Sequence, residues 1–254
     1  MKRSWHGLVA AASVIAVSVV VAACSDGGPP AQPTNVTPVD AATAGTIVVD
    51  VVYRGAVPAP KEVSMSAVPA CAALHSTPVY DQPIRVSNGH LADAVVYIKS
   101  GLGDRAFDFP TTAVQIDQRG CWYEPTVVAL RVGQPLEFVN SDPEAHNVHA
   151  SPKVAKGWNF MMSQRNARRT VYFTVPEVGV PVRCDVHPWM LAYVSAFSNP
   201  YFGISPAESP VTLAPVPPGQ YVVGVWHREL GMKEQPVTVA PQTTASIQVT
   251  YDAP

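Results

Sequence analysis

Charge is scarce in this sequence, and so is any long helical pattern. Only 14% of the 254 residues are charged and the formal net charge is −2, so nothing in the balance indicates a nucleic-acid partner. The 26 prolines are spread throughout the chain, and a proline inside a helix breaks it. With 47% hydrophobic residues, the chain still has enough apolar material for a folded core. Short strands joined by turns are therefore predicted, which makes the fold class all-β.

Only the N-terminus carries a sustained apolar run. Lys2 and Arg3 precede apolar residues 8–21, and small residues then lead to Cys24. This order is typical of an export signal over residues 1–23, and the run is shorter than the about 20 residues that a membrane span needs. The stretch resembles the lipobox of bacterial lipoproteins, which implies cleavage before Cys24 and lipidation of its thiol. The alternative is an ordinary secretory signal with a chance cysteine.

The leader predicts an exported lipoprotein of the cell envelope that meets the membrane through its lipid anchor only. Ser25 stands where an aspartate would favour retention at the inner membrane. The periplasmic face of the outer membrane is therefore expected in a two-membraned bacterium, and otherwise the outer face of the cytoplasmic membrane. Residues 24–45 are rich in Pro, Gly, Thr and Ala without an apolar period, which predicts a flexible tether.

Alternating apolar and polar residues predict the strands of the folded part. The first strand runs from Thr46 to Arg54, and the chain closes with another at 247–251. We divide the folded chain into an N-terminal β region over 46–125, a central region over 126–199 and a C-terminal β region over 200–254. The first and last of these regions are expected to pack together.

Cysteine is scarce as well, and one of the four stands in an unusual stretch. Cys184, His187 and Met190 place a thiol, an imidazole and a thioether within seven residues, and His146 lies upstream. Two His, one Cys and a weak axial Met form the ligand set of blue-copper electron-transfer sites. Each residue alone has a structural explanation, but their joint spacing favours one type 1 copper ion held by all four.

The strand pattern points the sulfur inward. Val180 and Val182 precede Cys184 on one face of an alternating strand, so the thiol ends an inward-facing row. Asn147, next to the first histidine, is placed to tie the two ligand segments together, and such outer contacts tune a metal site. Pro188 lacks a backbone donor and stiffens the ligand loop.

The two remaining cysteines, Cys71 and Cys121, are predicted to form a disulfide, because an exported protein occupies an oxidising compartment. The alternative is a second metal site that adds His75 to this pair, although the CxxC and CxxCH patterns are lacking. A site built from His75, His90 and His227 is a further alternative that rests on no shared motif.

Two segments, 138–149 and 184–190, resemble amicyanin and related plastocyanin-type cupredoxins, within a similarity that covers about 126–198. The short Cys-x2-His-x2-Met loop is similar to that of amicyanin. The resemblance implies a cupredoxin-type Greek-key β-sandwich in which His146, Cys184 and His187 are the strong copper ligands and Met190 is axial.

This sequence departs from the amicyanin pattern at two positions. Ala145 stands in place of a proline and Trp189 in place of a loop phenylalanine, and neither change removes a ligand. The flanking regions resemble transthyretin-like or carboxypeptidase-regulatory-like sandwich modules, which implies additional β-sandwich segments beside the copper region.

Together these features predict a non-enzymatic, lipid-anchored carrier of single electrons between redox proteins of the envelope. Trp189, Arg165, Arg168 and Arg169 form the candidate partner surface, on which the arginines would steer an acidic redox protein toward an exposed His187 edge. A solvated hairpin is the alternative for these arginines. The alternatives for the whole protein are a copper-storage lipoprotein, a β-sandwich interaction module with a vestigial site, and a multicopper enzyme, which would need a second centre for which no motif is present.

Overall fold

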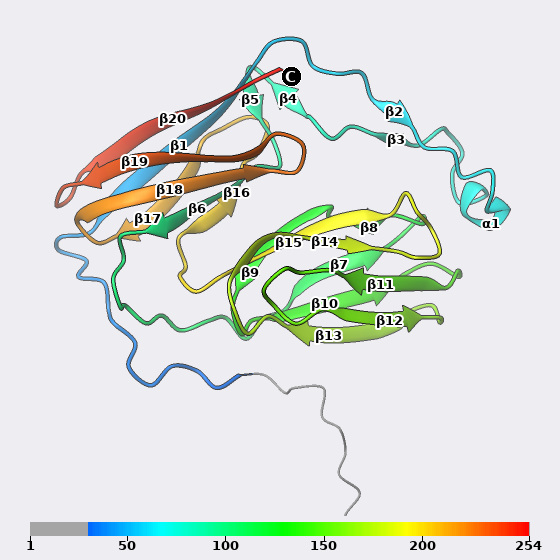
Figure 1. The fold of residues 1–254 in the computed structure, drawn as a ribbon, viewed down its shortest axis with the longest axis horizontal. Helices are drawn as coiled ribbons and strands as arrows, with labels where there is room; N and C mark the ends of the chain where they lie inside the picture. Colours follow the sequence, from blue (N-terminus) through cyan, green and yellow to red (C-terminus); the bar gives the residue numbers. More distant parts are fainter. Residues whose placement is uncertain (1–29, 254) are drawn as a thin grey trace, which may run out of the picture.

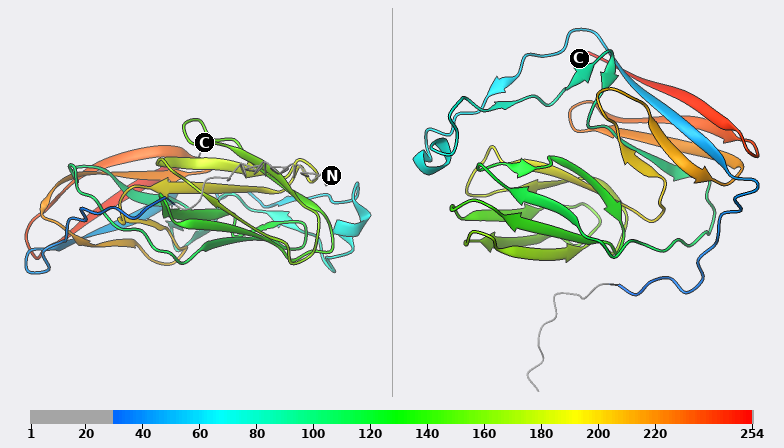
Figure 2. Two further views of the ribbon diagram at one scale, coloured as in Figure 1. Left: turned by 90° about the horizontal axis from the view of Figure 1, so that it is seen from below. Right: turned by 180° about the vertical axis from the view of Figure 1, so that it is seen from behind.

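The computed structural model describes residues 30–253 (Figure 1). The leader, Cys24 and the first residues of the predicted tether lie outside the described residues. The described part contains twenty strands and one four-residue helix, so the all-β prediction is confirmed. Figures 1 and 2 show the strands gathered into two β-sandwiches that lie side by side.

The first unit, which we name the flanking sandwich, is built from both ends of the chain. Its first sheet is centred on β1 (Gly45–Arg54), which pairs with the closing strand β20 (Thr244–Asp252) in parallel along its whole length. Every second residue of β1 is buried, as its alternating sequence predicts. The other strands of this sheet are β17 (Val211–Val216), β5 (His90–Leu91) and β4 (Val86–Ser87). The second sheet has the order β16 (Phe202–Ile204), β6 (Val95–Ser100), β18 (Gly219–His227) and β19 (Gly231–Val239).

The second unit, the central sandwich, carries the residues of the predicted copper site. One of its sheets has the order β13 (Arg168–Tyr172), β10 (Pro135–Asn140), β7 (Val114–Gln118) and β8 (Tyr123–Glu124). The other has the order β12 (Trp158–Met162), β11 (His146–Ala150), β14 (Glu177–Arg183), β15 (Leu191–Phe197) and β9 (Val127–Arg131). Their inner faces enclose a single core that includes Phe138, Val148 and Val194.

The predicted boundary between residues 125 and 126 differs from this arrangement. Strand β7 pairs in parallel with β10, so residues from about 114 onward belong to the central sandwich. The alternating pattern of β7 shows that it is a strand, but sequence periodicity does not reveal which sheet a strand joins. A small cluster around Val95, Tyr97, Val127 and Phe197 joins the two sandwiches.

One excursion of the chain leaves the flanking sandwich and reaches the end of the central one. This arm, residues 61–81, consists of β2 (Lys61–Glu62), α1 (Pro69–Ala72) and β3 (Tyr80–Asp81), with β2 and β3 paired at its base (Figures 1 and 2). The predicted disulfide is present and joins Cys71 in the arm to Cys121 in the central sandwich. The arm is therefore bound covalently at its far end.

The predicted tether is wrong from about residue 32 onward. The side chain of Gln32 exchanges two hydrogen bonds with the backbone of Phe109, at 2.7 and 3.0 Å, and Thr37 N–H donates to the carbonyl of Ala106. A glutamine amide carries both a donor and an acceptor, so one side chain pairs with both the N–H and the carbonyl of Phe109. Among residues 30–253, no helix is long and apolar enough to cross a membrane.

Candidate metal centre

The predicted ligands come from two anchored segments at one end of the central sandwich. His146 is the first residue of β11, and the loop from Cys184 to Met190 joins β14 to β15. Two backbone hydrogen bonds close this loop, from Cys184 N–H to the Met190 carbonyl and from Met190 N–H to the His187 carbonyl. The ligand loop is thus a compact turn whose shape is set by its own backbone.

Three of the four predicted donors converge in the structure. His146 Nδ1 lies 3.0 Å from His187 Nδ1, and Cys184 Sγ lies 3.6 Å from the same atom. The three donor groups lie within 4.8 Å of one another, and all three side chains are buried. Met190 is buried in the same core cluster as Cys184.

The spacing of these donors suits a single ion. For a metal about 2.0 Å from each nitrogen and about 2.3 Å from a thiolate sulfur, donors up to about 4 Å apart share that ion. Two imidazoles and one thiolate beside a buried thioether match the chemistry of copper better than that of Ca²⁺ or Mg²⁺, which take oxygen ligands. The donor set therefore fits a copper ion between His146, Cys184 and His187.

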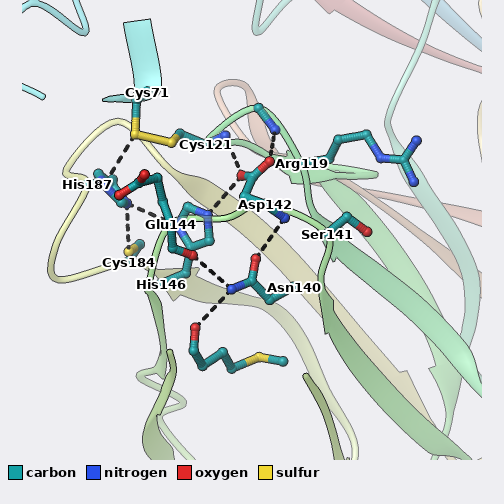
Figure 3. Close-up of polar contacts among 12 residues, drawn as sticks. Cys71, Arg119, Cys121, Asn140, Ser141, Asp142, Glu144, His146, Cys184 and His187 are labelled. Atoms are coloured by element: carbon teal, nitrogen blue, oxygen red, sulfur yellow. Dashed lines mark hydrogen bonds and ion pairs between the residues drawn. A yellow bond between two sulfur atoms is a disulfide. The ribbon is translucent and has the colours of Figure 1, made fainter. Parts of the chain in front are cut away.

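Asp142 orients the first histidine, and the sequence analysis did not identify it. Its Oδ2 accepts a hydrogen bond from His146 Nε2 at 2.9 Å, which leaves Nδ1 facing the other donors (Figure 3). The backbone N–H groups of Gly120 and Cys121 donate to the same carboxylate, each at 2.7 Å. Asn140 accepts from Asp142 N–H at 3.0 Å and so fixes the loop that carries it. The signal available in the sequence was an acidic residue four positions before a candidate ligand.

The protonation of the metal-free site follows from these contacts. Burial alone would lower the pKa of His146, but hydrogen bonds to Asp142 and Cys184 outweigh it and raise the pKa to about 9. Burial and the neighbouring His146 charge lower the pKa of His187. Burial opposes ionisation of Cys184, but the hydrogen bond from His146 and several backbone N–H groups lower its pKa overall. The proton on His146 Nδ1 therefore faces Cys184 Sγ and His187 Nδ1, at the place where a metal would bind.

Two further residues, Asn147 and Tyr123, join the segments that carry the ligands. Asn147 donates its backbone N–H to Cys184 Sγ at 3.3 Å, and its side-chain oxygen accepts from Asp185 N–H at 3.2 Å. The hydroxyl of buried Tyr123 donates to the Asn147 carbonyl at 2.6 Å and lies 3.2 Å from the carbonyl of Arg183. The tie predicted for Asn147 is thus seen in the structure, and Tyr123 reinforces it.

The prediction of an exposed His187 edge is wrong. Only 2% of His187 is accessible, because the arm covers it and Cys71 Sγ lies 3.3 Å from its Nε2 (Figure 3). The half-buried Trp189 packs its ring 5.4 Å from the imidazole and donates its indole N–H to the Cys121 carbonyl. The ligand pattern alone does not reveal this cover, since the arm lies more than 100 residues away in the sequence.

The remaining predicted residues are not among the converging donors. Pro188 and the three arginines are exposed; Arg168 pairs with Glu137 at 2.6 Å, and the Arg169 guanidinium lies 5.2 Å from the Phe160 ring. The alternative metal site with Cys71 and Cys121 is wrong, because the disulfide consumes both thiols. None of the potential metal-binding groups among residues 30–253 includes His75, His90 or His227.

Comparison with known proteins gives matches by structure but not by sequence. No family model and no curated protein matches this chain. A purple cupredoxin from Nitrosopumilus maritimus is 21% identical over 33% of this chain and 99% of its own, with a TM-score of 0.30. A mutant amicyanin in the Cu(I) form is 21% identical over 40% of this chain and 98% of its own, with a TM-score of 0.31. A copper-containing nitrite reductase from Thermus scotoductus is 19% identical over 59% of this chain but only 28% of its own, with a TM-score of 0.30. With such low scores, the case for a function rests on the geometry of the site.

Proposed function

We propose that this protein is a lipid-anchored blue-copper protein of the cell envelope that carries single electrons between redox proteins. The observation that supports this proposal is the convergence of His146 Nδ1, His187 Nδ1 and Cys184 Sγ in a buried site. In this proposal Met190, buried in the same core cluster as Cys184, would supply the weak thioether ligand. Bound copper would supply a one-electron couple, whose potential would depend on that thioether and on hydrogen bonds to the Cys184 sulfur.

The protein supplies a rigid frame for that couple. Asp142 fixes the tautomer of His146, and the Asn147 amide donates to the sulfur that would bind the ion. Ligands that are held in place by a second layer of hydrogen bonds move little when the charge of the ion changes. Small rearrangement favours rapid electron transfer, so the frame suits a carrier.

An absorption spectrum of the full-length protein in detergent after addition of Cu(II) tests the proposal. We expect an intense visible thiolate-to-copper band at one copper per chain, lost in Cys184→Ser and retained in His149→Gln, whose imidazole is bound to Asp185 at the surface. A colourless copper-loaded protein would refute the carrier role. Binding of several ions per chain would instead support copper storage. The Cys71–Cys121 disulfide argues against storage, because it leaves neither of these two thiols to bind copper.

A further inference from the structure

The covered position of His187 raises the question of how an electron would reach the surface. The disulfide sulfur of Cys71 touches His187 Nε2, and neither half of the disulfide is accessible. Cys71 belongs to α1, and the remaining helix residues and the two after it, 69, 70 and 72–74, are exposed. Figure 3 shows the sulfur of Cys71 between the helix and the imidazole. One residue of the arm thus connects His187 to a helix whose other residues are exposed to solvent.

The surface at this point carries no fixed charge. Residues 63–80 contain no Asp, Glu, Lys or Arg, although charged residues border the run at Glu62 and Asp81. The exposed residues of α1 and its end are small or apolar: Pro69, Ala70, Ala72, Ala73 and Leu74, of which Leu74 is 41% accessible. Beside them lies an open cavity of about 250 Å³, whose lining combines apolar side chains, such as Val63, Met65 and Val79, with the polar but acid-free His75, Ser76 and Thr77. We name these residues and the cavity the α1 face.

The α1 face is also fixed in position relative to the metal centre. The disulfide joins its inner side to Cys121, whose backbone N–H donates to Asp142 and whose carbonyl accepts from Trp189. At the base of the arm, Arg228 pairs with Asp81 at 2.6 Å. A surface that is held at both ends presents the same shape before and after docking, which lowers the cost of binding.

We propose that the α1 face is the docking surface for a redox protein whose own contact surface is uncharged and apolar, and that the electron passes between His187 and that partner by way of Cys71. This inference rests on the proposed electron-carrier function. The step moves one electron from the reduced copper of one protein to the acceptor of the other. No bond forms or breaks, no proton moves, and the disulfide stays oxidised throughout.

A second copy of this protein has the required uncharged surface, so electron self-exchange between reduced and oxidised copies provides the test. The exchange rate is measured by NMR line broadening on full-length protein in detergent. The proteins compared are wild type, Ala70→Glu, Leu74→Glu, the control Val57→Glu, and Arg165→Glu in the candidate partner surface. Val57 is 41% exposed, as Leu74 is, but lies in the segment between β1 and β2, outside the α1 face. We expect both α1 variants to exchange at least about tenfold more slowly than wild type and to recover part of the rate at high salt, because charges on a docking surface repel.

Three outcomes are possible once wild type and variants show the same visible band. Slow exchange in the α1 variants with an unchanged Val57→Glu supports the docking surface. Unchanged exchange in the α1 variants overturns it, and a loss confined to Arg165→Glu overturns it in favour of the candidate partner surface.

A metal-free measurement is independent of the copper couple. Amide chemical shifts at residues 63–79 are expected to change with protein concentration, and shift changes confined to other residues would contradict the proposal. Absence of the visible band in wild type would instead refute the electron-carrier function itself.

Discussion

Asp142 and His146 form a buried carboxylate–imidazole pair at 2.9 Å, and the carboxylate is itself held by two backbone amides. Burial alone would raise the pKa of Asp142, but its hydrogen bonds to His146, Cys121 and Gly120 outweigh this and lower it, so the group is ionised. Gly120 and Cys121 both have positive φ, as the two central residues of the tight hairpin turn between β7 and β8 require, and in this turn both N–H groups donate to the Asp142 carboxylate. The turn next to the disulfide therefore determines which nitrogen of His146 faces the metal.

Asp142→Asn should weaken copper binding about 10- to 100-fold, the usual cost of losing a contact that orients a metal-binding histidine. In the metal-free protein the same change should lower the pKa of His146 from about 9, since the Asp142 carboxylate and Cys184 together raise it and only Cys184 would remain. Competition with a copper chelator measures the affinity, and an NMR titration of the imidazole measures the pKa.

Glu144→Gln is the matched control for this prediction. It removes the same charge two residues from His146, but the Glu144 carboxylate makes no hydrogen bond to that ring. If Glu144→Gln weakens binding as much as Asp142→Asn does, the effect is one of overall charge, and the orienting role of Asp142 is wrong.

The Cys71→Ser/Cys121→Ser variant should lower the free energy of unfolding by about 4 kcal/mol, as expected for a loop closed over a separation of 50 residues. It should also uncover His187, because the arm loses its covalent attachment. Urea unfolding measures the stability. Acylation of His187 by diethyl pyrocarbonate in the metal-free protein, followed by mass spectrometry, measures how accessible the His187 imidazole is.

Wild-type protein with its disulfide intact provides the reference, and its His187 should resist acylation. His149 serves as the internal control, because its exposed imidazole should react equally in both proteins. Equal protection of His187 in both proteins would show that packing of α1, and not the disulfide, holds the arm in place.

The sequence alone predicted the strands around the site and the direction of the thiol. Val180, Val182 and Cys184 are all buried, as the period-two pattern requires, because alternation in a strand is a local property. The Cys71–Cys121 disulfide was also predicted correctly, since four cysteines, one in a ligand motif and one at the leader, left a single pair.

The burial of His187 was beyond sequence reasoning for a physical reason. The cover depends on where a 21-residue arm crosses the end of another sandwich, and this is set by long-range packing and not by local periodicity. The segment around Gln32 was mispredicted for the same reason. It has the composition of a tether, yet it is held on the fold by the Gln32 side chain paired with the Phe109 backbone and by Thr37 N–H donating to the Ala106 carbonyl.

Tyr123→Phe should destabilise the protein by about 1–2 kcal/mol, because it leaves the buried carbonyl of Asn147 and the part-buried carbonyl of Arg183 without their hydroxyl partner. Burial raises the pKa of Tyr123 far above its usual value, so the hydroxyl keeps its proton at every pH at which the protein would be studied. Urea unfolding of the metal-free protein checks the magnitude. Tyr80→Phe, at an exposed tyrosine of the arm, should change stability little, and an equal loss in both variants would contradict the role given to Tyr123.

His227 should make the flanking sandwich sensitive to acid. Its imidazole is fully buried, Nδ1 accepts from Glu229 N–H at 3.3 Å, and Nε2 has no partner among the described residues. Burial lowers its pKa to about 4, so between about pH 6.5 and 4 the unfolded chain binds a proton that the folded chain does not. Above about pH 6.5 the free energy of unfolding is unaffected by the protonation of His227. Below that pH it falls as the pH falls, and at pH 5 it is lower by about 2 kcal/mol. Urea unfolding of metal-free protein at pH 7.5 and 5 should show this loss in wild type and in His149→Gln but a smaller loss in His227→Phe; the same loss in all three would place the acid sensitivity elsewhere.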